Sequence, residues 1–364
     1  MDSRIRFALI GAGAIAQSYA QAFEECAGAQ LAAVVDLRID AARALAERFR
    51  CPSYATPEEV CENGVGFDAV LLCTPPNTHE ALSTFFLQRK IPVLCEKPFA
   101  LNPASARRML EAGRRAGVLL TMCSKFRYVE DVVRAKSIVL SGILGDIILF
   151  ENAFTSRVDM TERWNANPAV SGGGVLIDNG AHSVDLMRYF LGPLADVQVV
   201  EGKRVQGLEV EDTVRIFVRS KGGVLGSIDL SWSINKELDS YLNIYGSRGA
   251  ILVGWNESKY RQSSSRDWIV FGKGYDKVQA LRSQLSNFAR AVRGEERLLI
   301  AAEDALASVQ VIDAAYQALR GDHWTTIGAE AAESPTSTQR HRDVARHGPT
   351  PRLLDLLTSP HAKR

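Results

Sequence analysis

The first 125 residues alternate short apolar runs with helical patterns, and this alternation restricts the fold more than any other feature. Strands that alternate with helices in this way form a parallel sheet covered by helices on both faces. The pattern therefore predicts an α/β, doubly wound domain over residues 1–125. The expected strands are Arg6–Ile10, Gln30–Asp36, Phe67–Cys73, Pro92–Cys95 and Val118–Met122, and the expected helices begin near Ala14 or span Ala41–Phe49, Thr78–Gln88 and Pro103–Ala116.

After Ser124 the pattern changes to successive strands, which favours an antiparallel sheet. We predict a second α/β domain over residues 126–328, with β-rich stretches at Asp146–Ser156, Val197–Val205, Asp212–Val218, Gly223–Ser233 and Tyr241–Val253, and with helices at Val132–Leu140, Gln279–Arg293 and Ala302–Leu319. Residues 329–364 hold three histidines and four prolines. Irregular spacing favours a flexible tail there over a metal-binding one.

Charge and composition favour a small-molecule partner. The 364 residues hold 43 Lys and Arg against 42 Asp and Glu, so the net charge is +1. A nearly neutral chain has no general attraction to nucleic acid or to an anionic membrane, and no apolar run approaches the roughly 18 residues of a membrane span. The six cysteines form no CxxC pair, which predicts reduced thiols in a cytoplasmic protein.

A glycine-rich turn follows the first expected strand and opens a helix. Gly11-Ala12-Gly13-Ala14-Ile15-Ala16 matches the GxGxxG/A fingerprint of dinucleotide-binding proteins. Gly11 permits a tight turn, Gly13 lets the backbone approach a pyrophosphate, and the helix N-terminus that Ala14 and Ile15 begin stabilises the phosphate charge. The alternative is a glycine that serves only the turn.

An acidic residue ends the second expected strand. Asp36 is placed to accept hydrogen bonds from a ribose 2′-OH and would repel a 2′-phosphate, which favours NAD over NADP. Arg38 is the counter-argument, since it could pair with that phosphate. A helix-capping role for Asp36 is the structural alternative.

Two further polar segments end later strands of the parallel sheet, at the edge where such sheets bind ligands. One is Thr74-Pro75-Pro76-Asn77-Thr78-His79, although any strand-to-helix loop accepts such residues. The other is Cys95-Glu96-Lys97-Pro98. Charges at the end of a buried strand are costly to desolvate, so Glu96 and Lys97 are predicted to belong to a site.

Three glycines, at 172–174, precede a helical pattern that carries Asp178, His182 and Asp185. Residues four apart share one helix face, and a carboxylate beside an imidazole is the arrangement of a general base. An ordinary packed histidine is an equal alternative. A metal site is disfavoured because no further His or Cys lies near these residues in the sequence.

In this order and spacing, GAGAIA, TPPNTH, EKP and GGGVLIDNGAHSVD resemble the Gfo/Idh/MocA oxidoreductases. The resemblance covers about residues 4–328 and includes Gly142-Ile143-Leu144-Gly145 and Tyr245-Gly246-Ser247-Arg248-Gly249-Ala250. It implies a Rossmann domain, then a domain with an open, mostly antiparallel sheet whose outer face forms dimers or tetramers. It also implies a sugar, nucleotide-sugar or cyclitol as substrate.

The resemblance also implies roles for individual residues. Lys97 matches a lysine that contacts the substrate hydroxyl and the nicotinamide ribose, Asp178 and His182 match positions that bind substrate and move its proton, and Glu96 lies near the nicotinamide. Thr74, Pro75, Asn77 and His79 match the cofactor-contacting loop. Arg127 falls in a substrate-facing segment of relatives, although Ser124-Lys125-Phe126-Arg127-Tyr128 departs from their commoner form.

The resulting hypothesis is a dehydrogenase in which His182, oriented by Asp178, takes the hydroxyl proton while Lys97 hydrogen-bonds that oxygen. Arg157, Arg163 and Trp164 are candidates for the pocket wall, with an exposed loop as the alternative. Two other functions stay open: a glycoside hydrolase that recycles bound NAD, and a non-catalytic NAD-binding protein.

Overall fold

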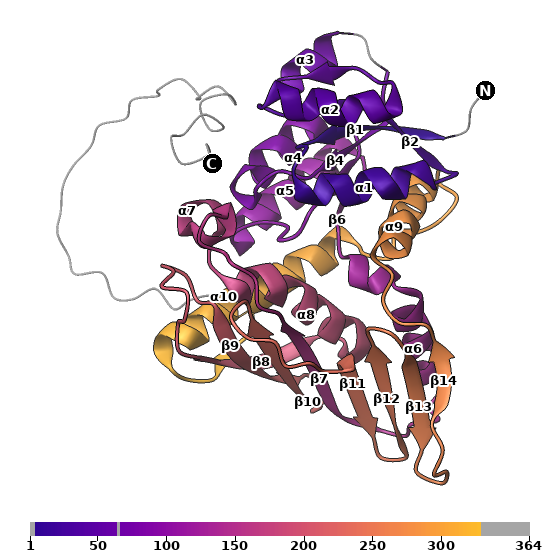
Figure 1. The fold of residues 1–364 in the computed structure, drawn as a ribbon, viewed down its shortest axis with the longest axis vertical. Helices are drawn as coiled ribbons and strands as arrows, with labels where there is room; N and C mark the ends of the chain where they lie inside the picture. Colours follow the sequence, from indigo (N-terminus) through magenta and orange to yellow (C-terminus); the bar gives the residue numbers. More distant parts are fainter. Residues whose placement is uncertain (1–3, 64–65, 329–364) are drawn as a thin grey trace, which may run out of the picture.

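The structure, a computed structural model, describes residues 4–63 and 66–328. The predicted tail at 329–364 lies outside the described residues. Two sheets make up the described part, with helices between them (Figure 1).

The first sheet has six parallel strands in the order β3-β2-β1-β4-β5-β6. This order is that of a dinucleotide-binding Rossmann domain and confirms the predicted fold class. Only β3 and α3 were not predicted, because a two-residue strand leaves no periodicity to detect. The strands are β1 (Ile5–Ile10), β2 (Ala29–Val35), β3 (Ser53–Tyr54), β4 (Ala69–Leu72), β5 (Val93–Cys95) and β6 (Leu120–Met122), and the helices are α1 (Ala14–Glu24), α2 (Ile39–Phe49), α3 (Pro57–Glu62), α4 (His79–Gln88) and α5 (Pro103–Ala116).

The second sheet has nine strands in the order β14-β13-β12-β11-β7-β10-β9-β8-β15. Only the β7–β10 pair is parallel, so the sheet is mostly antiparallel, as predicted. The stretch Tyr241–Val253 holds two strands joined by a turn, and the later strands β13, β14 and β15 were not predicted. The strands are β7 (Ile147–Thr155), β8 (Leu194–Glu201), β9 (Thr213–Ser220), β10 (Leu225–Ser231), β11 (Ser240–Gly246), β12 (Gly249–Gly254), β13 (Ser258–Gln262), β14 (Ile269–Gly272) and β15 (Thr325–Thr326).

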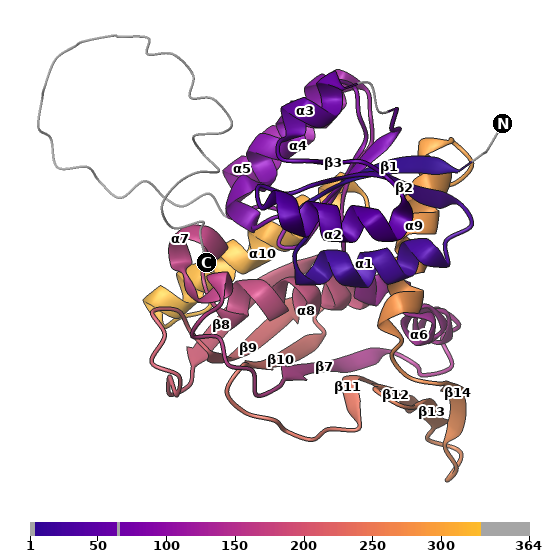
Figure 2. The same cartoon turned by 45° about the horizontal axis from the view of Figure 1, so that its top comes forward.

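Helices cover one face of the nine-stranded sheet. The helices α6 (Glu130–Leu140), α8 (Val175–Leu191) and α10 (Ala302–Gly321) lie on it, and α8 and α10 lie between the two sheets (Figure 2). No described helix covers the opposite face. The remaining helical segments are α7 (Pro168–Ser171), α9 (Lys277–Val292) and the 3-10 turns η1 (Pro76–Thr78), η2 (Lys125–Tyr128) and η3 (Trp164–Ala166).

Helices from the end of the chain complete the core of the first sheet. Helix α9 packs against α1, and its residues Leu281, Leu285 and Phe288 are buried with Phe7 of β1. The helix α10 contributes Val309 to the core on the other side of the sheet. The division between residues 125 and 126 stays a prediction, and the packing crosses it.

The glycines before α8 are required by close packing. The Glu211 carboxylate accepts hydrogen bonds from the Gly174 and Leu176 N–H groups at 2.9 and 3.0 Å, and from the Tyr316 hydroxyl at 2.8 Å. A Cβ at Gly173 would lie 1.8 Å from that hydroxyl, and one at Gly174 would lie 2.0 Å from the Glu211 carbonyl oxygen. Glu211 thus satisfies free N–H groups at the start of α8 and holds this end in place.

A buried ion pair joins η2 to the middle of α8. The Arg127 guanidinium donates to both carboxylate oxygens of Asp185, at 2.8 and 2.6 Å, and the Ser124 hydroxyl donates at 2.5 Å. The exposed fractions of the Arg127 and Asp185 side chains are 4% and 0%. Because each charge is out of water, each depends on the other for stabilisation.

We predict that Arg127→Leu lowers the free energy of unfolding by about 3–5 kcal/mol, because Asp185 is then a buried charge without its partner. Urea denaturation measures the change. The control is Arg43→Ala, which removes a surface ion pair with Asp40 and should cost less than about 1 kcal/mol. Equal effects of the two substitutions would contradict the prediction.

Candidate active site

The turn between β1 and α1 has the geometry of a phosphate-binding loop. Gly11 has a φ of +95°, and a Cβ there would lie 2.8 Å from the Cys73 carbonyl oxygen, so both backbone and packing require glycine. A Cβ at Gly13 would meet no atom within 4 Å. Packing within the chain does not require glycine at position 13, whereas close approach of a pyrophosphate to the helix N-terminus does. Ala16 is fully buried, as expected for close helix–sheet packing.

Asp36 lies beside this turn. Its carboxylate accepts hydrogen bonds from the Ala12 N–H at 2.7 Å and the Arg38 N–H at 2.8 Å. A helix cap would accept a hydrogen bond from an N–H group inside the first turn of α2, and Asp36 accepts none from there. The structure therefore does not support the helix-capping alternative for Asp36. The Arg38 side chain is largely exposed and pairs with Asp36 at 3.3 Å.

The loop after β4 is tied to the loop after β5 by His79. One ring nitrogen lies 2.9 Å from the Thr74 carbonyl oxygen and the other 3.0 Å from the Pro98 carbonyl oxygen. Burial lowers the pKa of His79. Its ring therefore positions the two loops, and a direct cofactor contact by that ring has no support here. Thr74 and Pro75 are half-buried and Asn77 is exposed on η1.

Glu96 is buried below the carboxyl edge of the sheet. The Tyr19 hydroxyl donates to its carboxylate at 2.7 Å and in turn accepts from the Gln284 amide at 2.8 Å. Burial raises the pKa of Glu96, and it raises the pKa of Tyr19 well above its usual value. This chain of bonds runs from α9 through α1 to the loop that carries Lys97.

Lys97 and Asp178 form an ion pair between the two halves of the chain. The Lys97 Nζ atom lies 2.5 Å from Asp178 Oδ1 and 3.0 Å from the Asp178 carbonyl oxygen. Both side chains are about four-fifths buried. Lys97 follows β5 of the first sheet and Asp178 lies in the first turn of α8, so the pair fixes an ammonium where the two sheets face each other.

His182 is one helical turn after Asp178, but the expected hydrogen bond between them is not formed. The Asp178 carboxylate binds the Lys97 ammonium, a stronger partner than a neutral imidazole. His182 Nδ1 is buried and has no hydrogen-bond partner among the described residues. Burial, followed by the charges of Lys97 and Lys125, lowers the pKa of His182 well below its usual value, so the ring is neutral.

Lys125, on η2 after β6, is a site residue that our sequence reasoning missed. Its half-buried side chain is electrostatically coupled to Lys97, Glu96 and Asp178. The signal was available: β6 is a strand of the parallel sheet, so the residues after it reach the same edge as Thr74 and Lys97.

The other three predicted substrate residues lie in different surroundings. The Arg127 guanidinium is committed to Asp185, which gives it a structural role in place of the substrate contact suggested by the sequence. Arg157 is exposed, and Trp164, whose exposed fraction is 37%, begins η3. Both lie in the segment that leads to α7, and α7 packs against η1 of the Thr74–His79 loop. That segment therefore approaches the first sheet.

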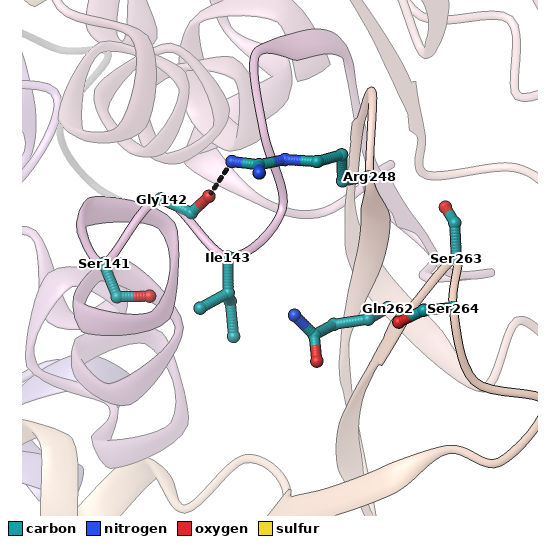
Figure 3. Close-up of a pocket in the computed structure, with 7 residues that line it drawn as sticks. All are labelled: Ser141, Gly142, Ile143, Arg248, Gln262, Ser263 and Ser264. Carbon is teal, nitrogen blue, oxygen red and sulfur yellow. Dashed lines mark hydrogen bonds between the residues drawn. The ribbon is translucent and has the colours of Figure 1, made fainter.

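A hollow at the far end of the nine-stranded sheet involves two motifs of the resemblance (Figure 3). There the Arg248 side chain donates to the Gly142 carbonyl oxygen at 3.0 Å, and the Arg248 N–H donates to the Leu144 carbonyl oxygen at 2.9 Å. These contacts hold the start of β7 against the β11–β12 turn. The two motifs are therefore structural and contribute nothing to the Lys97 site.

Within residues 4–63 and 66–328, no group of three or more His, Cys, Asp or Glu side chains is arranged to hold a metal ion. In the same part of the chain, no helix is long and apolar enough to cross a membrane.

Both domains of the chain match models of one known protein family. Residues 5–124 match the oxidoreductase family with an NAD-binding Rossmann fold, and residues 132–252 match the C-terminal domain of the same Gfo/Idh/MocA family. The chain belongs to this family. As a Gfo/Idh/MocA oxidoreductase it has NAD as its cofactor class, and the free space at Gly13 together with Asp36 fits that cofactor.

Individual relatives agree with the family. The chain is 30% identical over 259 residues to myo-inositol 2-dehydrogenase of Thermotoga maritima, covering 68% of this chain and 75% of the relative. It is 28% identical to the rhizopine catabolism protein MocA of Rhizobium meliloti, covering 88% and 96%. A solved levoglucosan dehydrogenase, in complex with NADH and levoglucosan, has the same fold, with a TM-score of 0.83 at 17% identity over 89% of this chain and 100% of that one.

We predict that Gly13→Ala weakens NAD binding at least about tenfold, or about 1.4 kcal/mol, because the methyl group occupies the side from which the pyrophosphate approaches. Stability should stay close to that of the wild type, because the φ of −74° suits alanine and the new Cβ meets no atom. Fluorescence titration with NADH and thermal unfolding measure the two effects.

The matched substitution is Gly11→Ala, which should destabilise the fold through its strained backbone and its clash with Cys73. An unchanged NADH affinity in Gly13→Ala would remove this turn from the cofactor site.

Proposed function

We propose that this oxidoreductase oxidises a secondary alcohol of a sugar, nucleotide-sugar or cyclitol, with NAD as the oxidant. The observation that carries the proposal is the Lys97–Asp178 pair beside the neutral His182, at the carboxyl edge of a dinucleotide-binding sheet. Relatives named as inositol, glucoside and levoglucosan dehydrogenases support the substrate class.

Gly11, Gly13, Ala14, Ile15 and Asp36 would hold the adenosine and pyrophosphate end of NAD, and Thr74, Pro75, Asn77, Glu96 and Lys97 would border its nicotinamide end. When bound, NAD supplies the hydride acceptor. The Asp36 carboxylate would accept hydrogen bonds from the ribose hydroxyls and would repel a 2′-phosphate, which supports NAD over NADP. Arg38 pairs with Asp36, which supports the carboxylate over a 2′-phosphate as its partner.

Lys97 and His182 have different roles toward the substrate hydroxyl. The Lys97 ammonium, held by Asp178, donates a hydrogen bond to the oxygen, and the neutral His182 ring accepts its proton. Asp178 orients the lysine, in place of the role toward His182 that the sequence suggested.

The charges around His182 also bear on the substrate. Lys97 and Lys125 lower the pKa of His182 because they disfavour a third positive charge. The same field favours a negative charge, so an alkoxide that develops on the substrate oxygen is stabilised where the imidazolium is not. This compensates for the low basicity of His182 and keeps its ring neutral, ready to accept a proton at neutral pH.

The direct test is nicotinamide reduction, followed by its near-ultraviolet absorbance, with NAD and NADP and a panel of cyclitols, sugars and nucleotide-sugars. We expect turnover with members of one class and a higher kcat/KM with NAD than with NADP. An enzyme that binds NAD and reduces none of it across the panel would contradict the proposal. It would favour a recycled, tightly bound cofactor.

We predict that Lys97→Ala lowers kcat at least about a hundredfold and leaves the Kd for NAD nearly unchanged, because the lost hydrogen bond strengthens only as charge develops on the substrate oxygen. The substitution also removes one of the two cations that lower the pKa of His182. That pKa should therefore rise, which NMR of the imidazole measures. Near-normal turnover would exclude Lys97 from the catalytic residues.

The uncovered face of the nine-stranded sheet supports a homodimer or homotetramer, a further part of our proposal. Phe217 and Leu225 have exposed fractions of 37% and 55% on this face, and they line a hollow together with the half-exposed Trp324. Apolar side chains gathered on an open sheet face favour contact with a second copy.

The six cysteines are all free, which supports our prediction of a cytoplasmic location.

We predict that Phe217→Glu separates the oligomer into monomers, because a charge at the centre of an apolar contact is desolvated without a partner. Light scattering after size-exclusion chromatography measures the mass. The control is Arg107→Glu, an exposed position on α5 of the first sheet, which should leave the mass unchanged. An equal mass for all three proteins would rule out this face.

A further inference from the structure

Lys125 carries a charge that nothing in the described chain pairs with. Its Nζ atom makes no hydrogen bond and no ion pair among residues 4–63 and 66–328. The other lysine of the site differs, since Lys97 has Asp178 at 2.5 Å. Lys125 is therefore the unsatisfied cation of the active site.

The surroundings of Lys125 make its charge costly. Burial, then the charges of Lys97 and Lys277, lower its pKa to about 8, and Glu96 and Asp178 offset only part of this effect. Asp178 is already neutralised by Lys97, and Glu96 is buried with a raised pKa. A half-buried ammonium held near two like charges is stabilised most by an anion that comes from outside the chain.

Aromatic rings hold Lys125 next to the reacting centre. Its Nζ atom lies 5.3 Å from the centroid of the Phe126 ring and 5.9 Å from that of Tyr275. The Phe126 ring also contacts the His182 ring edge to face, with centroids 5.1 Å apart. Lys125 and the proposed proton acceptor thus lie against the same phenyl ring, and the charge of Lys125 acts on His182.

We propose that Lys125 binds the substrate directly and that the substrate carries an anionic group, a carboxylate or a phosphate, close to the carbon that is oxidised. This inference rests on the proposed function and narrows its substrate class to acidic sugars, acidic cyclitols and their phosphates. Anion binding supplies the negative charge that Lys125 lacks, and it keeps the ammonium protonated in the complex.

The test compares matched substrates that differ in one group: a hexose, the corresponding hexuronate and the corresponding hexose phosphate. The wild type should have a kcat/KM at least about tenfold higher for one of the anionic members than for the hexose. Lys125→Met should abolish that preference mainly through KM, so that kcat/KM falls at least about tenfold more on the anionic member than on the neutral hexose. The carboxylate and phosphate arms identify which anion is preferred.

Lys136 provides a matched control. It is also a half-buried lysine over aromatic rings, but it lies on α6, and its Nζ atom donates to the Tyr189 carbonyl oxygen. Lys136→Met should leave the preference for the anion unchanged. The KM of the wild type for the anionic substrate should rise as the pH passes about 8, because Lys125 then loses its charge. Lys125→Met should lack this rise.

A binding experiment separates this inference from the proposed function. The hexose, the hexuronate and the hexose phosphate are titrated calorimetrically into the enzyme loaded with NADH, where no oxidation occurs. Lys125→Met should bind the preferred anion at least about tenfold more weakly than the wild type, even if no substrate of the panel is oxidised.

Three results would overturn the inference. One is equal affinity of the wild type for the anionic and neutral members. Another is an equal loss on both members in Lys125→Met, which would indicate a merely structural residue. The third is a loss of NADH affinity in Lys125→Met, which would assign the lysine to the cofactor.

Discussion

Each charge buried between the two sheets needs a partner, and this requirement organises the centre of the molecule. Helix α8 brings Asp178 and Asp185 into that space, and each carboxylate binds a cation that follows a strand of the first sheet. Asp185 binds Arg127 and stabilises the joint. Asp178 binds Lys97, which places an ammonium beside a neutral His182. The ion pair that stabilises the joint and the ion pair at the candidate site are therefore alike, and their carboxylates lie about one helical turn before and after His182 on α8.

Much of this arrangement could be predicted from the sequence, because its signals are local. The alternation of strands and helices predicts the six-stranded sheet, and the glycine turn with Asp36 predicts the NAD site. Residues that follow parallel strands must reach one edge of the sheet, and this rule selected Glu96 and Lys97. The same rule applied to β6 selects Lys125, although its segment departs from the form that is commoner in relatives.

The pairing of side chains could not be predicted, because it depends on contacts distant in sequence. Asp178 and His182 share a helix face, yet the carboxylate binds Lys97, 81 residues away. Arg127 was expected at the substrate, but it binds Asp185, 58 residues away. The sequence shows three glycines before α8, but the cause of two of them, the approach of Tyr316 to Gly173 and of Glu211 to Gly174, depends on residues distant in sequence. The tertiary packing determines which hydrogen-bonding partner each side chain meets, and no short stretch of sequence encodes that packing.

Helix α9 has a consequence for how the molecule is made. The first sheet is encoded by the opening third of the chain, yet Leu281, Leu285 and Phe288 close its core, and Gln284 ends the bonds that run through Tyr19 to Glu96. A ribosome releases these residues long after β6. Until then the face of the sheet under α1 keeps apolar surface exposed, and the nascent first half depends on the rest of synthesis for its final packing. Folding of the NAD-binding half is thus coupled to completion of the other half, so both become functional together.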